Sequence, residues 1–435
     1  MNPRNPSNKK LWCFVIGFLL LVILLPVILA MLPIWDGPPV DDSDMEIVYR
    51  EIPDEQNAFE LFRKAEKFML PIPDVWNDWE EDPQAHAEEI RAWVDANQEA
   101  LRLLAKGVAL GDYQVPEAKP LTGGVPWIKK SREMGLLLWM ASRIEKDPSP
   151  RVDLHLLQLR HAEFIYNAGS SLIEAVMGTI LYNLALASVP ETVWSPETET
   201  ESLRKLMATL VELRLGKERM VRAYQAEYRY GVENLQFSIR PKTAFARPFI
   251  RSGTWGYQEE NTKRLYLQHH RQAIAYLQGE GPMDQEEDSP SAIIKFTDRI
   301  APMIRNSHNW IGKRFFSNTA VSRERTINQF KATLADLHAL RLVTALQLYH
   351  REHGHLPDTL DALVPDLLDE VPVDPFDGQP FRYLPAEARI YSIGKNREDN
   401  GGSIRVITRR RSTPDRNHTE DRVYGVFEEV EFLQD

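Results

Sequence analysis

Residues 345–402 read ALQLYHREHGHLPDTLDALVPDLLDEVPVDPFDGQPFRYLPAEARIYSIGKNREDNGG. They begin at the end of a predicted helix over 321–353, since Gly354 is a natural residue after a helix and Pro357 prevents the helix from resuming. Asp-Pro and Asp-Gly pairs then predict turns, and two short segments rich in aromatic and β-branched residues predict antiparallel strands, over 381–383 and 389–393. The stretch therefore predicts a helix, a loop, a short antiparallel sheet and a polar turn.

An ordered set of aromatic, proline and glycine positions runs through this stretch. The set comprises Tyr349, Gly354, Pro357, Leu360, Leu363, Val364, Pro365, Pro372, Asp374, Pro375, Phe376, Gly378, Pro380, Tyr383, Tyr391, Ser392, Gly394, Asp399, Asn400, Gly401 and Gly402. It resembles the C-terminal domain of the major pseudopilin of type II secretion systems over about residues 330–402, with a final strand expected within 422–432. The resemblance implies a long helix packed on a small antiparallel sheet.

The resemblance also implies a cation site, because in that family the loop after the Tyr-Ser-x-Gly strand can bind calcium. The corresponding loop here offers side-chain oxygens from Asn396, Glu398, Asp399 and Asn400, together with backbone carbonyls. Calcium takes six to eight oxygen ligands, whereas this loop is short and contains Lys395 and Arg397. The alternative is an Asx-type turn, in which Asp399 and Asn400 accept hydrogen bonds from nearby backbone amides. The two cations and the loop length favour the turn; calcium is the one cofactor that the sequence suggests.

Two departures separate the chain from a fibre-forming pseudopilin. Processing there requires a glutamate five residues after a glycine, but Val22 stands at that position after Gly17. Moreover, roughly 290 residues lie between Trp35 and Glu324, whereas in a pseudopilin the membrane segment and this helix are continuous. We therefore expect a pseudopilin-like module at the end of a larger envelope protein, and no processed fibre subunit.

Residues 11–34 (LWCFVIGFLLLVILLPVILAMLPI) are apolar and carry no charge. As a helix they would span about 36 Å, enough to cross a hydrocarbon core of about 30 Å. Arg4, Lys9 and Lys10 precede the segment, and acidic residues follow it, so the positive-inside rule puts the N-terminus in the cytoplasm. A cleaved signal peptide is the alternative, but the run is longer than such a peptide requires and lacks a good A-x-A site. An uncleaved inner-membrane anchor with an extracytoplasmic C-terminal region is favoured.

The region between the anchor and the module shows helical periodicity, interrupted by short Pro- and Gly-containing loops. Short loops between amphipathic helices predict antiparallel neighbours, so we expect an irregular helical bundle or solenoid. The predicted helices cover 57–70, 85–110, 127–145, 153–166, 170–189, 196–234 and 258–278. The fold class is therefore mainly α, and the predicted organisation is a cytoplasmic tail over 1–10, a transmembrane helix over 11–34, a linker over 35–54, a helical extracytoplasmic domain over 55–320 and the pseudopilin-like module over 321–435.

Composition excludes several classes of function. The formal net charge of −11 argues against nucleic acid as a partner, because neutralising phosphates needs an excess of Lys and Arg. The only cysteine, Cys13, lies in the apolar segment, so no intrachain disulfide forms. Aromatic and basic residues alternate over 237–257, which fits either contact with anionic lipid or, as we favour, an irregular connection over the bundle.

No catalytic constellation stands out in the sequence. Standard metalloprotease, nucleophile-elbow, dinucleotide and P-loop motifs are absent. His350, His353 and His355 could hold a metal, but their spacing around Gly354 favours exposed side chains without one. Glu163 in His161-x-Glu163 has no evident partner, and His161 is expected on a polar face; acidic runs at 80–82 and 88–89 are expected in solvent.

Two functions remain open. The first is a non-enzymatic, membrane-anchored interaction or structural protein, with the lipid bilayer and another envelope protein as partners and a link to type II secretion-like machinery. The second is an extracytoplasmic hydrolase or ligand-binding protein with a site between helices of the middle domain, recognisable as a pocket where polar groups converge.

Overall fold

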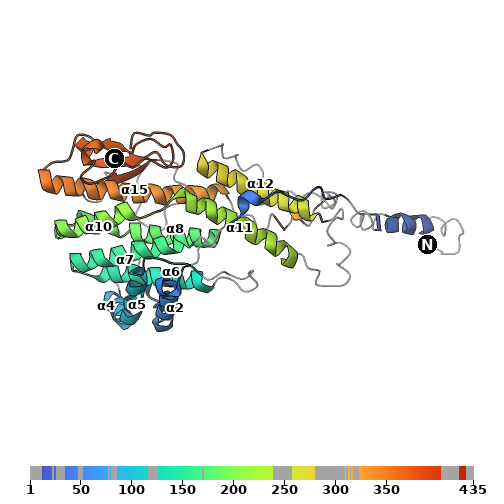
Figure 1. The fold of residues 1–435 in the computed structure, drawn as a ribbon, viewed down its shortest axis with the longest axis horizontal. Helices are drawn as coiled ribbons and strands as arrows, with labels where there is room; N and C mark the ends of the chain where they lie inside the picture. Colours follow the sequence, from blue (N-terminus) through green and yellow to red (C-terminus); the bar gives the residue numbers. More distant parts are fainter. Residues whose placement is uncertain are drawn as a thin grey trace, which may run out of the picture. The chain divides into compact units, whose positions relative to one another are not determined.

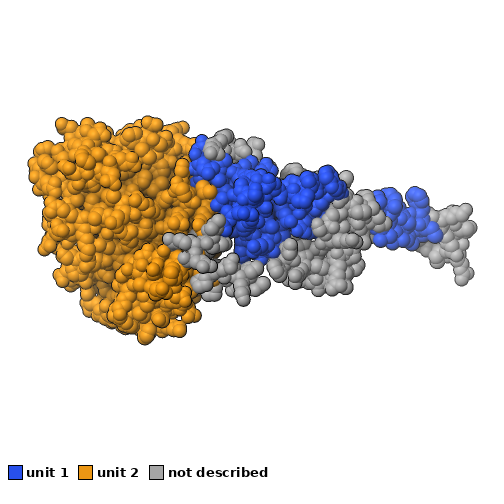
Figure 2. All heavy atoms as spheres, in the orientation of Figure 1, with its two compact units in different colours: residues 1–48, 224–324 blue, residues 49–223, 325–435 orange. Residues whose placement is uncertain are grey.

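The computed structural model describes residues 12–21, 24–25, 35–47, 52–76, 79, 86–115, 126–168, 171–238, 257–279, 309, 312–313, 315–316, 323–402 and 421–427. Over these residues the chain is mainly helical with a small three-stranded antiparallel sheet, which confirms the predicted fold class at that level. The chain divides into unit 1, residues 1–48 and 224–324, and unit 2, residues 49–223 and 325–435 (Figure 2). The predicted domains over 55–320 and 321–435 stay predictions, because the division into units does not show whether either of them folds on its own.

Unit 2 is built around α7, which packs against α6, α8 and α10, while α2 and α5 pack against each other on its flank (Figure 1). The short loops between these helices bring neighbours in sequence together in space, as expected for a bundle. The helices are α2 (Phe59–Phe68), α4 (Ala87–Ala96), α5 (Gln98–Val108), α6 (Pro126–Ile144), α7 (Pro148–Asn167), α8 (Leu172–Leu186), α9 (Val189–Trp194) and α10 (Thr200–Glu212).

Two predicted helices are each broken in the structure. The helix expected over 85–110 stops at Asn97, whose side-chain amide donates to the Trp93 carbonyl at 2.7 Å and accepts from the Leu70 amide at 2.9 Å. The helix expected over 196–234 is interrupted after α10, where Arg341 donates to the carbonyls of Leu210 and Leu213. At Asn97 the residue's own side chain takes a carbonyl of the preceding turn, and after α10 a distant arginine takes two carbonyls. Helical periodicity of apolar residues contains neither signal.

The C-terminal part of unit 2 consists of a long helix and the sheet. Helix α15 (Arg323–His353) ends at Gly354, which has the predicted left-handed conformation, with φ of 78°. Strands β1 (Arg382–Leu384), β2 (Arg389–Ser392) and β3 (Arg422–Gly425) follow in that spatial order, all antiparallel. In the register, Arg382 is opposite Tyr391 and Tyr391 is opposite Val423. Both predicted strands and the expected final strand are therefore present.

Two aspartates fix the sheet. Asp374 is fully buried and accepts hydrogen bonds from the Phe376 amide, the Ile393 amide and the Ser392 hydroxyl at 2.9–3.0 Å, so it ties the Asp-Pro turn to the end of β2. Asp336 of α15 accepts from Arg422 of β3. The helix and the sheet are thereby joined through charged hydrogen bonds as well as apolar contacts.

Unit 1 contains α12 (Glu259–Gln278) and the part of α11 (Lys217–Ser238) that follows Ala223. One buried cluster of its core consists of Met45, Tyr228, Tyr266 and Leu267, against which half-buried apolar side chains pack. Met45 belongs to the one-turn 3-10 helix η1 (Ser43–Met45), so a segment close to the N-terminus supplies part of this core.

The segment over 36–46, called the strap below, is attached to the two helices by polar contacts. Asp36 accepts from the backbone amides of Glu260 and Asn261 at 3.0 Å each, and so caps the first turn of α12 from outside the helix. Arg271 of α12 pairs with Asp44 at 2.6 Å, and the Tyr228 hydroxyl of α11 donates to Asp42 at 2.8 Å. Residues that the sequence assigns to a linker are thus part of a packed unit.

Two helices are notably apolar. Among the described residues, the only helical stretch long and apolar enough to cross a membrane is Leu172–Trp194, about 61% of whose most apolar window is buried inside the protein. At the predicted N-terminal position the structure describes a shorter apolar helix, Trp12–Leu21, whose large side chains are exposed. The rest of the predicted transmembrane helix, apart from residues 24–25, and the cytoplasmic tail over 1–10 lie outside the described residues.

Candidate functional site

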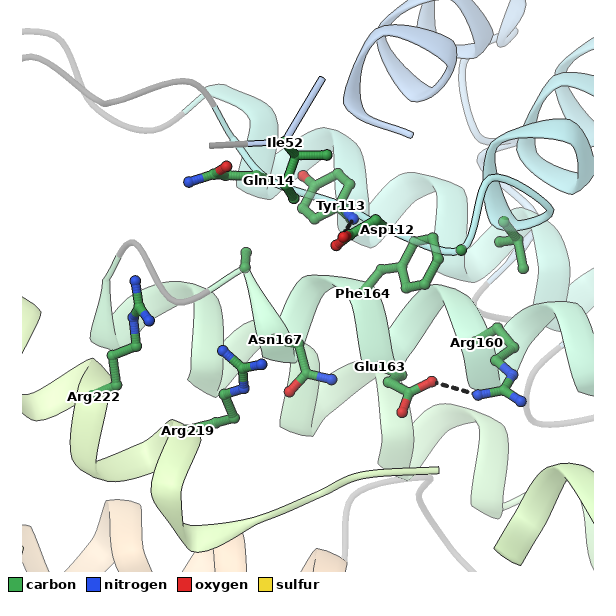
Figure 3. A pocket seen from close by; sticks show the side chains of 13 residues that line it. Ile52, Asp112, Tyr113, Gln114, Arg160, Glu163, Phe164, Asn167, Arg219 and Arg222 are labelled. Carbon is green, nitrogen blue, oxygen red and sulfur yellow. Dashed lines mark hydrogen bonds and ion pairs between the residues drawn. The ribbon is translucent and has the colours of Figure 1, made fainter. Parts of the chain in front are cut away.

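A polar pocket of about 530 Å³ lies within unit 2, between the loop after α5, the C-terminal half of α7 and the first turns of α11 (Figure 3). This volume is in the range of small-molecule sites. The pocket is lined by Ile52, Val108, Gly111, Asp112, Tyr113, Gln114, Arg160, Glu163, Phe164, Asn167, Ala168, Arg219 and Arg222.

Asn57 fixes the loop that forms one wall of the pocket. Its side-chain amide donates to the Gln114 carbonyl at 2.8 Å and accepts from the Gln114 amide at 3.0 Å. The neighbouring Ala58 amide donates to the Asp112 carbonyl at 2.9 Å, which gives a short parallel bridge. Residues 112–114 are therefore held as an extended segment by a buried asparagine far away in sequence, and their side chains have defined positions.

Helix α7 supplies the opposite wall. Arg160, Glu163, Phe164 and Asn167 follow the i, i+3, i+4, i+7 spacing that puts side chains on one face of a helix. The end of α7 is fixed because Gly178 of α8 lies against the backbone of Tyr166, where a Cβ atom would come within 2.4 Å of the Tyr166 Cα. This close approach requires glycine and sets where the α7 side chains enter the pocket.

Glu163 and Arg160 form a closed ion-pair network at one end of the pocket (Figure 3). Glu163 is nearly buried, and its two oxygens accept from Arg160 Nη1 at 2.9 Å and from the Arg214 backbone amide at 2.8 Å. The other Arg160 Nη atom pairs with Glu212. Burial lowers the pKa of Arg160, but the two carboxylates outweigh it and the pKa is raised. Glu163 thus serves as a fixed hydrogen-bond acceptor. Its partners, which the sequence did not reveal, are the Arg160 side chain and the Arg214 backbone amide.

The aromatic wall of the pocket continues into the core. The rings of Tyr113 and Phe164 stack with centroids 6.2 Å apart, and Phe62 contacts both. Burial raises the pKa of the Tyr113 hydroxyl, with Glu174 acting in the same direction, so this phenol stays protonated. The aromatic wall can pack against an apolar group of a ligand, but Tyr113 does not act as a phenolate base.

His161 contradicts the expectation of a polar face. It is fully buried, its ring packs edge-on against Phe62 at 5.4 Å, and neither ring nitrogen has a hydrogen-bond partner among the described residues. Burial lowers its pKa to about 4. The prediction was wrong because a histidine next to apolar residues on a helix suggests one polar and one apolar face. Helix α7 is instead surrounded by other helices of the bundle, so both faces are buried.

The remaining pocket residues escaped the sequence analysis. Arg219 and Arg222 lie at i, i+3 near the start of α11, which was expected to be the middle of a longer helix. Asn167 ends α7 in the Asn-Ala-Gly-Ser-Ser stretch that was treated only as a breaker. The i, i+3 spacing of the arginines could have shown that they share a helix face. Nothing in the sequence indicates that this face lies against α7.

The candidate calcium loop is organised by Asx-type turns. Asp399 Oδ1 accepts from the Gly401 amide at 2.9 Å, and the Asn396 side-chain oxygen accepts from the Glu398 amide at 3.3 Å. Asn400 differs from the expectation: its side-chain oxygen accepts from the Asn396 side chain, and its backbone amide donates to Asp421 at 3.0 Å. Asp421, which the sequence analysis missed, closes the loop.

Of the three candidate histidines, His353 and His355 lie near each other, with ring centroids 6.3 Å apart, whereas His350 has a different neighbour. His350 packs edge-on against Phe427 at 4.7 Å, whereas His353 stacks on Tyr349 at 4.0 Å and uses Nδ1 on its own helix. In the described part of the chain, no cluster of three or more histidine, cysteine or acidic side chains could hold a metal ion. The acidic run at 80–82 and residues 239–256 of the aromatic and basic segment lie outside the described residues.

Comparisons with protein-family models, with curated proteins and with solved structures give no match.

Proposed function

We propose that the chain is a single-pass membrane protein whose extracytoplasmic part recognises a small ligand without catalysing a reaction. The observation that carries the recognition role is the pocket in unit 2, where polar side chains from α7 and α11 converge beside an aromatic wall. One of its two carboxylates, Glu163, is held on both oxygens by donors, an arrangement that suits a structural acceptor better than a group that transfers protons.

The exposed apolar helix at the N-terminus supports the membrane anchor. The large side chains of Trp12–Leu21 are exposed, with Trp12 at 64% and Phe14 at 73%, and such a surface needs a covering medium. Ten residues cover only about 15 Å, so the anchor requires the following residues of the predicted span as well. The N-terminus lies in the cytoplasm in this proposal, and everything after Trp35 lies outside.

Leu172–Trp194 is the competing membrane segment, and its surroundings favour a core helix. Tyr182 and Ala185 are fully buried, and the Asn183 side chain accepts from the Thr333 hydroxyl of α15 at 2.7 Å. Glu174, at the start of the segment, accepts from the Trp127 indole at 2.8 Å. A helix that binds polar partners on several sides belongs to a protein interior rather than to lipid.

Topology is tested by expressing the full chain with a C-terminal tag in a bacterial host. We expect the protein to stay in the membrane pellet after a carbonate wash and to lose its tag when protease is added to spheroplasts. A tag protected from protease until the membrane is lysed, or a chain released in soluble form, contradicts the anchored extracytoplasmic arrangement.

Recognition is tested with the full chain in detergent, by a thermal-shift screen of anionic, neutral and cationic small molecules. A ligand at a hundred times its Kd raises stability by about 2.7 kcal/mol. Val108→Trp fills the pocket, and Ala109→Trp places the same side chain next to it outside the lining. We expect some compounds to raise the melting temperature of the unsubstituted chain and of Ala109→Trp. The same compounds should not raise that of Val108→Trp. A screen without hits, or hits indifferent to Val108→Trp, counts against the binding role.

An envelope protein partner is a second candidate function, and the C-terminal module favours it. Helix α15 carries a three-stranded antiparallel sheet, the arrangement that the resemblance to pseudopilins implies for this part of the chain. We expect photocrosslinkers on the exposed side of the module, for example at Glu398, to capture a discrete membrane-complex protein in cells. Crosslinking that yields only the free chain counts against a link to secretion-like machinery.

A further inference from the structure

The charges in the pocket indicate which class of ligand it takes; this step rests on the proposed binding role. We propose that the pocket recognises a small organic anion that carries a hydroxyl group next to its carboxylate or phosphate and an apolar group beyond it. Arg219 pairs with the anionic group, Asn167 accepts from the hydroxyl, and the wall at Phe164 packs against the apolar part.

Arg219 supplies the cation. The chain is acidic overall, with a formal net charge of −11, yet three arginines line this pocket. Arg160 is neutralised by Glu163 and Glu212. In the described part of the chain, by contrast, no carboxylate forms an ion pair with the exposed Arg219. The lining contains three arginines but two carboxylates, Asp112 and Glu163, so positive side chains outnumber negative ones there.

Asn167 supplies an acceptor that lacks a donor. Its side-chain oxygen is buried and receives no hydrogen bond from the described residues. Turning the Asn167 amide toward the pocket would let this oxygen accept from a ligand hydroxyl, which supplies the missing donor. Figure 3 shows Asn167 of α7 and Arg219 of α11 directed toward the same space, so one ligand can reach both.

Phe164 and Tyr113 supply the apolar surface. Phe164 precedes Asn167 by three positions and therefore shares its face of α7, and Tyr113 stacks on it from the opposite wall. An apolar group attached to the anion would lie against these rings while the polar groups stay at Arg219 and Asn167. The closed pair of Arg160 and Glu163 bounds the far end.

Four probes separate these contributions in calorimetric titrations of the full chain in detergent. Mandelate carries the carboxylate, the neighbouring hydroxyl and a ring; phenylacetate lacks the hydroxyl, mandelamide lacks the charge, and benzylamine reverses it. We expect mandelate to bind most tightly, phenylacetate about tenfold more weakly, and mandelamide and benzylamine not measurably. The affinity for mandelate should fall as salt rises.

Variants assign the contributions to residues. Arg219→Ala should weaken mandelate about ten- to hundredfold, and Arg219→Lys should restore part of the loss. Lys217→Ala, an exposed cation two positions earlier that does not line the pocket, should leave the affinity unchanged. Asn167→Ala should reduce mandelate to the level of phenylacetate and leave phenylacetate unaffected. Each variant is first checked for an unchanged melting temperature.

Two results overturn the inference. If mandelate and phenylacetate do not bind at millimolar concentration, or if Lys217→Ala weakens mandelate as much as Arg219→Ala does, the pocket is not an anion site. Benzylamine or mandelamide could instead bind tightly and lose that binding in Val108→Trp. This result would contradict the anion inference and still support the binding role of the pocket. If no compound of any class binds in the thermal-shift screen, both the ligand-binding role and the anion inference are contradicted.

Discussion

Units 1 and 2 are both mainly helical, but unit 1 is also closed by a strap that polar contacts attach to its helices. Unit 2 has an extended apolar interior that includes fully buried Leu104, Leu137 and Leu138. Unit 1 also buries apolar side chains, Tyr228 and Leu235 among them, and it is in addition closed by a strap whose aspartates bind α11 and α12. Salt does not screen apolar burial, whereas it does screen charged contacts near the surface. The comparison predicts that the two units respond to different perturbations.

Removing apolar volume from unit 2 should have the largest effect. Leu137→Ala in α6 deletes a fully buried side chain, so we expect a loss of about 2–5 kcal/mol in the free energy of unfolding. Leu110→Ala, with 36% exposure, removes the same atoms near the surface and should cost well under half as much. Denaturant unfolding followed by tryptophan fluorescence measures both. Equal losses for the two variants would contradict the assignment of the unit 2 core.

Acid should destabilise unit 2 through its buried histidines. Burial lowers the pKa of His155 to about 3 and that of His161 to about 4, from an ordinary value of 6.5. Below pH 6.5 the unfolded chain therefore binds protons that the folded chain does not, so stability falls between about pH 6.5 and 3. The full shift of His161 corresponds to on the order of 3 kcal/mol.

His161→Leu tests the assignment, because an apolar side chain fits beside Phe62 and no hydrogen bond from the described residues is lost. We expect the variant to be at least as stable at pH 7 and to lose less stability at pH 4. His353→Leu, at an exposed position, serves as the matched control. An unchanged pH slope in His161→Leu would show that other groups dominate acid unfolding.

The strap should be the weak point of unit 1. Asp36→Ala removes the acceptor for two backbone amides at the start of α12, and we expect a local loss of about 1 kcal/mol. Hydrogen exchange of the Glu260 and Asn261 amides should accelerate while amides in α7 keep their protection. The control is Glu46→Ala, whose side chain is 72% exposed. Uniform acceleration in both units would mean that the strap has no local role.

Calcium removal should have the smallest effect. The oxygens of Asp399 and Asn396 already accept hydrogen bonds from Gly401 and Glu398, so the loop is closed without an ion. We expect EDTA to leave the melting temperature of the full chain unchanged. A melting temperature that falls with EDTA and recovers with added calcium would instead support calcium binding at this loop.

Local patterns predicted much of the fold. Helical periodicity located most helices of both units, and Gly354, Asp374 and the strand-forming segments located the end of α15 and the sheet. The same patterns failed at Asn97, whose side chain accepts from the Leu70 amide, and at residues 213–216, beside carbonyls that bind Arg341. Those partners lie far away in sequence, so a local window cannot contain them.

The sequence by itself determined what depends on neighbouring residues: the helices, the turns, the strands and the apolar N-terminal segment. Only the tertiary structure decided which side chains meet. It buried His161, joined Glu163 to Arg160 and the Arg214 amide, attached the strap to α12, and brought Arg219 of α11 near Asn167 of α7. The physical reason is that a pocket is defined by contacts across long chain separations, whereas periodicity and turn chemistry report contacts within a few residues.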